Sequence, residues 1–96
     1  MNSKYNPVYP YYDDIFAKEQ KKSSSKVIYF GNGTDLEEVK GKIIEIVKEP
    51  QGEFLVFETG EKVRIDRIIT INGIPGPAYD EYDRFALACL DCSINN

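Results

Sequence analysis

The residues of this chain best suited to chemistry are its two cysteines, Cys89 and Cys92, which stand in the arrangement Cys-Leu-Asp-Cys in a sequence without histidine. One C-x-x-C motif supplies only two of the four ligands that a structural zinc needs, so a metal site would also require Asp91 or a second subunit. A redox-active thiol needs a helix N-terminus or nearby cations, whereas this pair follows an apparent helix and lies beside an acid. We therefore interpret Cys89 as a small core residue.

The other polar residues form no recognisable catalytic set. With no histidine in the chain, a general acid–base group for neutral pH is missing, and no Ser or Thr stands beside a base. Gly31-Asn32-Gly33 is typical of a hairpin turn and not of a phosphate-binding loop. Asp80 and Asp83 could bind a divalent cation, but carboxylates one helical turn apart are common at helix N-termini. The sequence predicts a non-enzymatic protein with no metal or cofactor.

The net charge of −4 is unevenly distributed along the chain. Five lysines and three acids lie in residues 1–26, six basic and nine acidic residues in 27–77, and Arg84 with four acids in 78–96. Nucleic-acid binders usually carry a basic face that neutralises phosphates. This distribution argues against nucleic acid and favours a basic protein partner or an ordinary solvated acidic surface.

The length and composition predict one soluble domain. Ninety-six residues with 42% hydrophobic and 29% charged content are enough for a single small core. The longest apolar run, residues 85–90, is too short to cross a membrane. Met1 is followed by Asn, Ser, Lys and Tyr, which is not the pattern of a basic and then apolar leader. We expect a cytoplasmic protein without membrane contact.

Alternating apolar and charged residues between glycine-bearing turns predict a small antiparallel sheet. The expected strands cover residues 26–30, 36–48, 53–59, 62–66 and 68–71. Gly41 lies in the middle of the longest strand, where a small barrel must bend sharply. Five short strands without a crossover helix indicate a mainly β fold, a closed or nearly closed five-stranded antiparallel barrel of the SH3-like or Sm-like kind with flanking helices.

The expected segments on either side of the barrel carry the candidate binding residues. The predicted organisation is a Tyr-rich arm and short helix in 1–25, the barrel in 26–72, a Pro/Gly linker in 73–77 and an amphipathic helix in 78–92. Asp13 or Asp14 is expected to cap the first helix. Asp80 and Asp83 lie in the first turn of the second, which could either cover one barrel mouth or present an acidic, tyrosine-bearing tip to a basic partner.

Several short blocks resemble one known family. They are Met1-Asn2, Tyr5, Pro7-Val8 and Asp13-Asp14, then Glu53-Phe54-Leu55-Val56-Phe57-Glu58, then Gly60-Glu61 followed by Val63-Arg64-Ile65-Asp66-Arg67-Ile68. In this order they resemble the Rho-binding antiterminator (Rof) family over about three-quarters of the chain. The family's Tyr-Asp-rich helix string has its nearest counterpart at residues 79–89, after the expected barrel, and not at residues 12–16.

The resemblance implies an Sm-like barrel that binds the hexameric termination factor Rho through an acidic surface and obstructs RNA loading. Asp13, Asp14 and Glu19 would then make the contact. If the C-terminal helix has taken over this role, the contact residues would be Tyr79, Asp80, Tyr82 and Asp83. The predicted function is a protein-interaction module that regulates transcription termination.

A small Sm-like RNA-binding barrel is the alternative function. The chain has a modest basic cluster of Lys18, Lys21, Lys22 and Lys26, and such barrels often carry RNA on aromatic-rich faces. The barrel segment itself is negative, however, and the aromatic residues are not interleaved with these lysines in the sequence.

Overall fold

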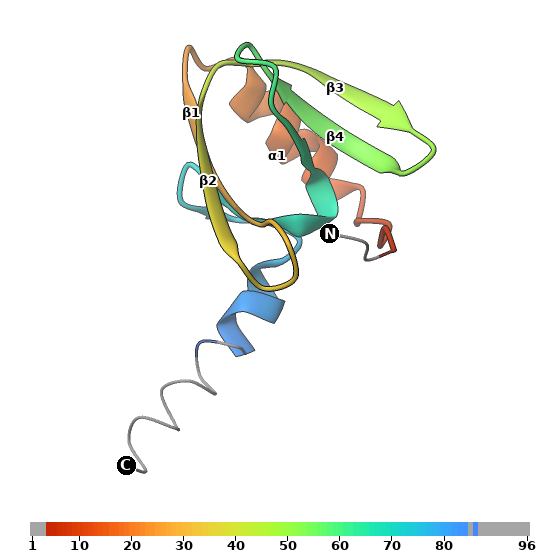
Figure 1. The fold of residues 1–96 in the computed structure, drawn as a ribbon. Helices are drawn as coiled ribbons and strands as arrows, with labels where there is room; N and C mark the ends of the chain where they lie inside the picture. Colours follow the sequence, from red (N-terminus) through yellow and green to blue (C-terminus); the bar gives the residue numbers. More distant parts are fainter. Residues whose placement is uncertain (1–3, 85, 87–96) are drawn as a thin grey trace.

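A computed structural model of the chain describes residues 4–84 and residue 86. An extended arm leads into one helix, which precedes a succession of short strands (Figure 1). The elements are α1 (Tyr11–Gln20), β1 (Ser25–Phe30), β2 (Leu36–Gly41), β3 (Ile43–Glu49), β4 (Gly52–Phe57), β5 (Lys62–Arg64), the 3₁₀ helix η1 (Ile65–Arg67), β6 (Ile68–Ile71) and β7 (Ile74–Pro75). A second helical segment begins at Tyr79. The predicted mainly β fold with flanking helices is confirmed.

The strands form two antiparallel sheets. One sheet has the order β2-β1-β6-β7 and the other has the order β3-β4-β5. In the first sheet β1 is central, so that Val27 faces Val39 of β2 on one side and Ile71 of β6 on the other. Within residues 4–84, the strands are grouped into two sheets, whereas the sequence predicts a single closed or nearly closed five-stranded barrel.

The expected long strand over residues 36–48 is broken at Lys42. Its first half is β2, which pairs with β1, and its second half is β3, which pairs with β4. The Glu58 amide donates to the Lys42 carbonyl at 2.9 Å, and the Lys42 amide donates to Glu58 Oε2 at 3.2 Å. A Cβ at Gly41 would lie 3.8 Å from the Phe57 ring, an ordinary contact. The hydrogen bonds between Lys42 and Glu58 therefore explain the break in the strand better than a lack of room for a side chain at Gly41 does.

Phe16 of α1 is buried in a core that draws on both sheets. Its cluster contains Val27, Val39, Ile43, Leu55, Phe57, Val63, Ile65, Ile68 and Ile71. A smaller cluster of Phe30, Ile69 and Ala78 packs against Tyr79 and Tyr82. Each large apolar side chain buried in this way contributes about 1.5–3 kcal/mol. The two helical segments are therefore held to the sheets by two different clusters.

The first helix starts without the expected aspartate cap. Pro10 occupies the N-cap position and makes no side-chain capping bond. The amides of Tyr12 and Asp13 donate to the carbonyls of Tyr9 and Pro10 at 3.0 and 2.9 Å. Asp13 and Asp14 lie within the first turn, where negative charge interacts favourably with the helix dipole. The capping prediction is wrong, and both carboxylates remain exposed.

The expected linker, residues 73–77, is bound to the first sheet. It contains β7, which pairs with β6. The Gly76 amide donates to the Ile69 carbonyl and the Ala78 amide to the Ile68 carbonyl, both at 2.8 Å. A Cβ at Gly76 would lie 2.6 Å from the Ile68 carbonyl oxygen, so only glycine allows this close approach. The chain that follows is thereby anchored at its start.

The C-terminal helical segment comprises residues 79–84 and projects from the end of the sheets (Figure 1). Residue 86 is also helical. The remainder of the helix predicted over 78–92, with Cys89 and Cys92, lies outside the described residues. In the part of the chain that the structure describes, no helix has both the length and the apolar character needed to cross a membrane.

Candidate functional site

A cleft of about 180 Å³ lies between the start of α1 and the start of the C-terminal helical segment. Tyr9, Tyr12, Asp80 and Glu81 are among the residues that line it. We call this cleft, with these lining residues, the acidic cleft. The Tyr9 side chain is 74% exposed, and both carboxylates are exposed as well. The fold thus joins the Tyr-rich arm to the acidic turn of the second helix, two features far apart in the sequence.

Tyr12 connects the two walls of the acidic cleft. Its hydroxyl donates a long hydrogen bond of 3.5 Å to the Gly76 carbonyl, and its ring stacks on Tyr11 with centroids 4.2 Å apart. Burial, the hydrogen bond with Tyr11 and the negative charge of Asp80 raise the pKa of Tyr12 to about 12. The hydroxyl therefore stays protonated at neutral pH and remains a hydrogen-bond donor.

Glu19 lies away from this cleft, in the interior. Its side chain is 1% exposed. It forms an ion pair with Lys22 Nζ at 2.8 Å and accepts a hydrogen bond from Asn72 Nδ2 at 2.7 Å. These two hydrogen bonds lower the pKa of the Glu19 carboxyl, against the opposing effect of burial. Glu19 is therefore a buried structural residue and not the exposed contact that the resemblance implies.

The predicted residues of the second helix separate into packed tyrosines and exposed acids. Tyr79 and Tyr82 are half-buried and pack against the smaller core cluster. Asp80 and Asp83 are exposed, and Asp80 lines the acidic cleft whereas Asp83 does not. The tyrosines hold the helix in place, and among these four predicted residues Asp80 lines the cleft together with Tyr12 of α1.

Glu81 is a cleft residue that the sequence reasoning did not select. Its carboxylate lies 3.7 Å from Arg67 Nη1, and its side chain is 48% exposed. The feature of the sequence that could have identified Glu81 is its position beside Asp80 in the first turn of the second helix. Nothing in the sequence could indicate the approach of Arg67, because η1 and this turn meet only through the fold.

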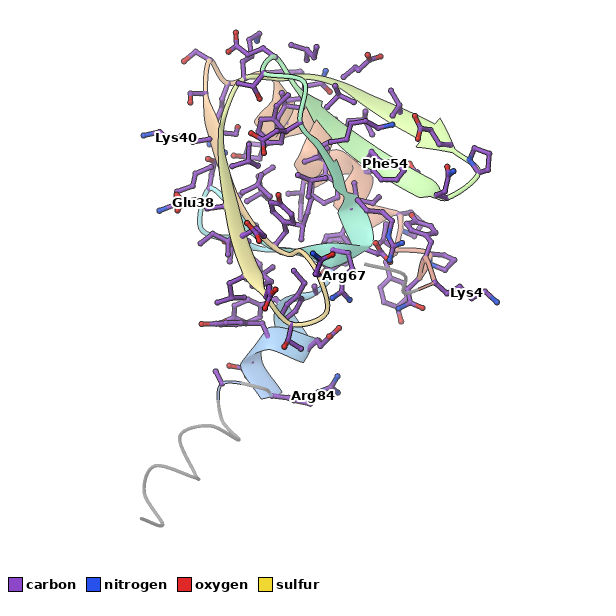
Figure 2. The ribbon with its side chains drawn as sticks, in the orientation of Figure 1. Lys4, Glu38, Lys40, Phe54, Arg67 and Arg84 are labelled. Carbon is purple, nitrogen blue, oxygen red and sulfur yellow. The ribbon has the colours of Figure 1, made fainter. Side chains whose placement is uncertain are left out.

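A larger groove, of about 940 Å³, is lined by the arm, β1 and the loop after it, the β3–β4 turn, β4 and the β5–η1 segment. Its lining includes the cations Lys4, Arg64 and Arg67, one acid, Glu37, and the rings of Tyr5, Tyr29, Phe30 and Phe54. In Figure 2, Lys4 and Phe54 lie toward the right of the molecule and Arg67 near its middle, whereas Lys40 and Glu38 lie at the left. We call this feature the aromatic groove.

Cations lie over aromatic rings at the aromatic groove. Arg67 Cζ is 4.9 Å from the centre of the Phe30 ring, and Arg64 Cζ is 5.8 Å from that of Tyr5. Arg64 is itself held by Asp66, with Nε to Oδ1 at 2.6 Å and Nη2 to Oδ2 at 3.1 Å. The sequence reasoning missed this groove because its rings and cations come from separate segments and are not interleaved along the chain.

Among residues 4–84, no group of three or more His, Cys, Asp or Glu side chains is placed to hold a metal ion. Comparison of the chain with protein-family models, with curated proteins and with solved structures finds no match.

Proposed function

We propose that this protein is a non-enzymatic interaction module that docks a basic protein partner at the acidic cleft. The observation that carries the proposal is the meeting of Asp80 and Glu81 with the exposed ring of Tyr9 at one surface. Carboxylates attract and orient a partner's Lys and Arg side chains. An exposed tyrosine adds a rigid apolar contact with a polar tip, which is common where proteins bind one another.

The proposal also covers how the two sheets relate to a barrel. If β2 and β3 are counted as one strand bent at Lys42, the strand order becomes β7-β6-β1-β2/β3-β4-β5. Strands β1 to β5 then form a meander, and β6, which follows β5 in the chain, returns to pair with β1. We infer that the two sheets are the halves of an open SH3-like or Sm-like barrel, with α1 and the C-terminal helical segment as additions that build the acidic cleft.

The resemblance to Rho-binding antiterminators makes the Rho hexamer the first partner to test. In that family an acidic surface binds Rho and obstructs RNA loading. Asp13 and Asp14 are exposed in the first turn of α1 and do not line the cleft, so they would add a separate acidic contact beside Asp80 and Glu81. The protein would then regulate transcription termination in the cytoplasm.

Charge reversal tests the proposal directly. The double variant Asp80→Lys/Glu81→Lys should weaken binding to purified Rho by about tenfold or more, because it places like charges against the partner. The matched control is Glu38→Lys/Glu45→Lys, which makes the same charge change on exposed residues of β2 and β3. The control also breaks one 3.7 Å ion pair, that of Glu38 with Lys26, as the test variant breaks that of Glu81.

Binding would be measured by biolayer interferometry, with circular dichroism to verify the fold of each variant. Equal loss of affinity in both double variants would mean that overall charge, and not the acidic cleft, controls the interaction. Absence of binding by the unchanged protein would reject Rho as the partner.

A further inference from the structure

The aromatic groove has a charge opposite to that of the molecule as a whole. The chain carries −4, yet three cations and one acid line the groove. Of the three cations, Arg64 is paired with Asp66, so Lys4 and Arg67 are the ones that bear on a ligand. The acid, Glu37, lies on β2, whereas Lys4 comes from the arm and Arg67 from η1. Such a local reversal of charge favours a negatively charged ligand in the groove.

The groove also presents aromatic rings to a ligand. Tyr5, Tyr29 and Phe54 line it and are each half-buried, so part of each ring is accessible. Burial and the negative charge of nearby carboxylates raise the pKa of the Tyr5 and Tyr29 hydroxyls above the usual value, and both hydroxyls can donate hydrogen bonds at neutral pH. Rings along a groove that also carries cations are the arrangement on which successive nucleobases stack while the phosphates are neutralised.

Arg67 has a charge that its own surroundings compensate only in part. Its side chain is 11% exposed. One Nη2 hydrogen bond of 2.8 Å goes to the Gly33 carbonyl, while Nε is buried and has no hydrogen-bond partner among the described residues. Glu81, at 3.7 Å, is beyond good hydrogen-bond distance. Because an incompletely paired buried charge is costly, an anion in the groove would stabilise this arginine.

We propose that the aromatic groove binds single-stranded RNA, with phosphates near Lys4 and Arg67 and bases against Tyr5, Tyr29 and Phe54. An acidic peptide would match the charge but would leave the rings without planar partners. A duplex keeps its bases stacked inside and is bound through a broader basic face than this chain has. The cations used differ from the lysine cluster considered in the sequence, and the site does not depend on the partner of the acidic cleft.

The test is fluorescence anisotropy of the full chain with a labelled single-stranded RNA, at low salt and again at physiological salt. Lys4→Glu should weaken binding about fivefold, because it reverses an exposed charge at the groove. Lys40→Glu makes the same charge change at a residue that does not line the groove (at the left in Figure 2) and should leave affinity unchanged. Lys4 and Lys40 are both exposed, so both variants should fold.

Two further variants examine the groove itself. Phe54→Leu keeps an apolar side chain but removes the ring, and should weaken binding about tenfold because base stacking is lost. Glu37→Gln removes the acid from the lining and should strengthen binding.

Four results with nucleic acid would overturn the proposal, and a fifth comes from a peptide. They are no binding at low salt, equal losses for Lys4→Glu and Lys40→Glu, equally strong binding of a duplex of the same sequence, and an unchanged affinity in Phe54→Leu. A poly-glutamate peptide that binds more tightly than the RNA would assign the groove to carboxylates and would overturn it too.

Discussion

Glu19 is the most deeply buried charged side chain in the described part of the chain, and its partners determine how the fold responds to acid. The hydrogen bonds from Lys22 and Asn72 hold the pKa of its carboxyl below the usual value. A group with a lowered folded-state pKa contributes stability above its unfolded pKa, and this contribution disappears as the pH falls through the folded pKa. Acid should therefore weaken the attachment of α1 to the turn that contains Asn72.

Replacing Glu19 by glutamine tests this dependence. Glu19→Gln keeps the size of the side chain but removes its charge, and should lower the free energy of unfolding by about 1–3 kcal/mol at neutral pH. The difference from the unchanged protein should begin to shrink as the pH falls below the pKa of an unfolded glutamate, and should vanish below the lowered folded-state pKa of Glu19, where both side chains are neutral. Urea unfolding at several pH values would measure it.

The control for this prediction is Glu38→Gln. Glu38 is exposed and pairs with Lys26 at 3.7 Å, so its loss should change stability little at any pH. The role assigned to the Glu19 carboxylate would be contradicted by one result. That result is a difference in the free energy of unfolding, between Glu19→Gln and the unchanged protein, that stays constant from neutral pH into acid.

Individual site residues were predictable only where the local sequence carries the signal. Asp80 stands in an acidic first helical turn, and that pattern, together with the family resemblance of residues 79–89, marked it as a candidate. The sequence also suggested that Glu19 is an exposed acid on a short helix. In the fold, however, Asn72, which is 53 residues further along the chain, donates a hydrogen bond to its carboxylate and helps to cover it. Contacts of this kind have no local pattern, which is also why the pairing of Arg67 with Glu81 was missed.

Two glycines differ in the space that their surroundings leave for a side chain. At Gly76 an added Cβ would lie 2.6 Å from the Ile68 carbonyl oxygen and 2.9 Å from Ile68 Cγ2. At Gly41 the nearest atom to an added Cβ would be a Phe57 ring carbon at 3.8 Å. Backbone cannot move aside as easily as the end of a flexible side chain, so the two positions should respond differently to alanine.

We expect Gly76→Ala to lower the free energy of unfolding by about 1–3 kcal/mol, as overpacking does in well-packed regions. Gly41→Ala should change it by less than about 1 kcal/mol. In a strand, alanine loses less conformational entropy on folding than glycine, and this gain offsets the cost of placing a methyl group at the site. Chemical denaturation of both variants measures the difference. An equal cost at the two positions would mean that the bend near Lys42 requires glycine after all.

The strands were predictable from alternation and turn residues, but their grouping into sheets was not. Residues 26–30, 53–59 and 68–71 were expected as strands and correspond to β1, β4 and β6 within a few residues. The break at Lys42 depends on Glu58, which lies in a different turn. Residues 74–75 become β7 only because β6 offers a free edge, a condition set by the fold and not by the Pro/Gly composition.

The molecule carries two surfaces of opposite character. The acidic cleft joins α1 to the C-terminal helical segment, while the aromatic groove lies among the arm, β1, β4 and η1. Arg67 lines the groove and Glu81 lines the cleft, so their 3.7 Å ion pair lies between the two surfaces. A net charge of −4 conceals this division, because the basic side chains of the groove are outnumbered elsewhere.

The central claim is that the acidic cleft docks a basic protein. The most direct measurement is an affinity pull-down from native lysate with nuclease present, using three baits: the unchanged protein, Asp80→Lys/Glu81→Lys and Lys4→Glu. The account predicts one basic protein partner that the unchanged bait and Lys4→Glu both retain and that the cleft variant loses. Recovery of the same partner by the cleft variant, at equal yield, would contradict the claim.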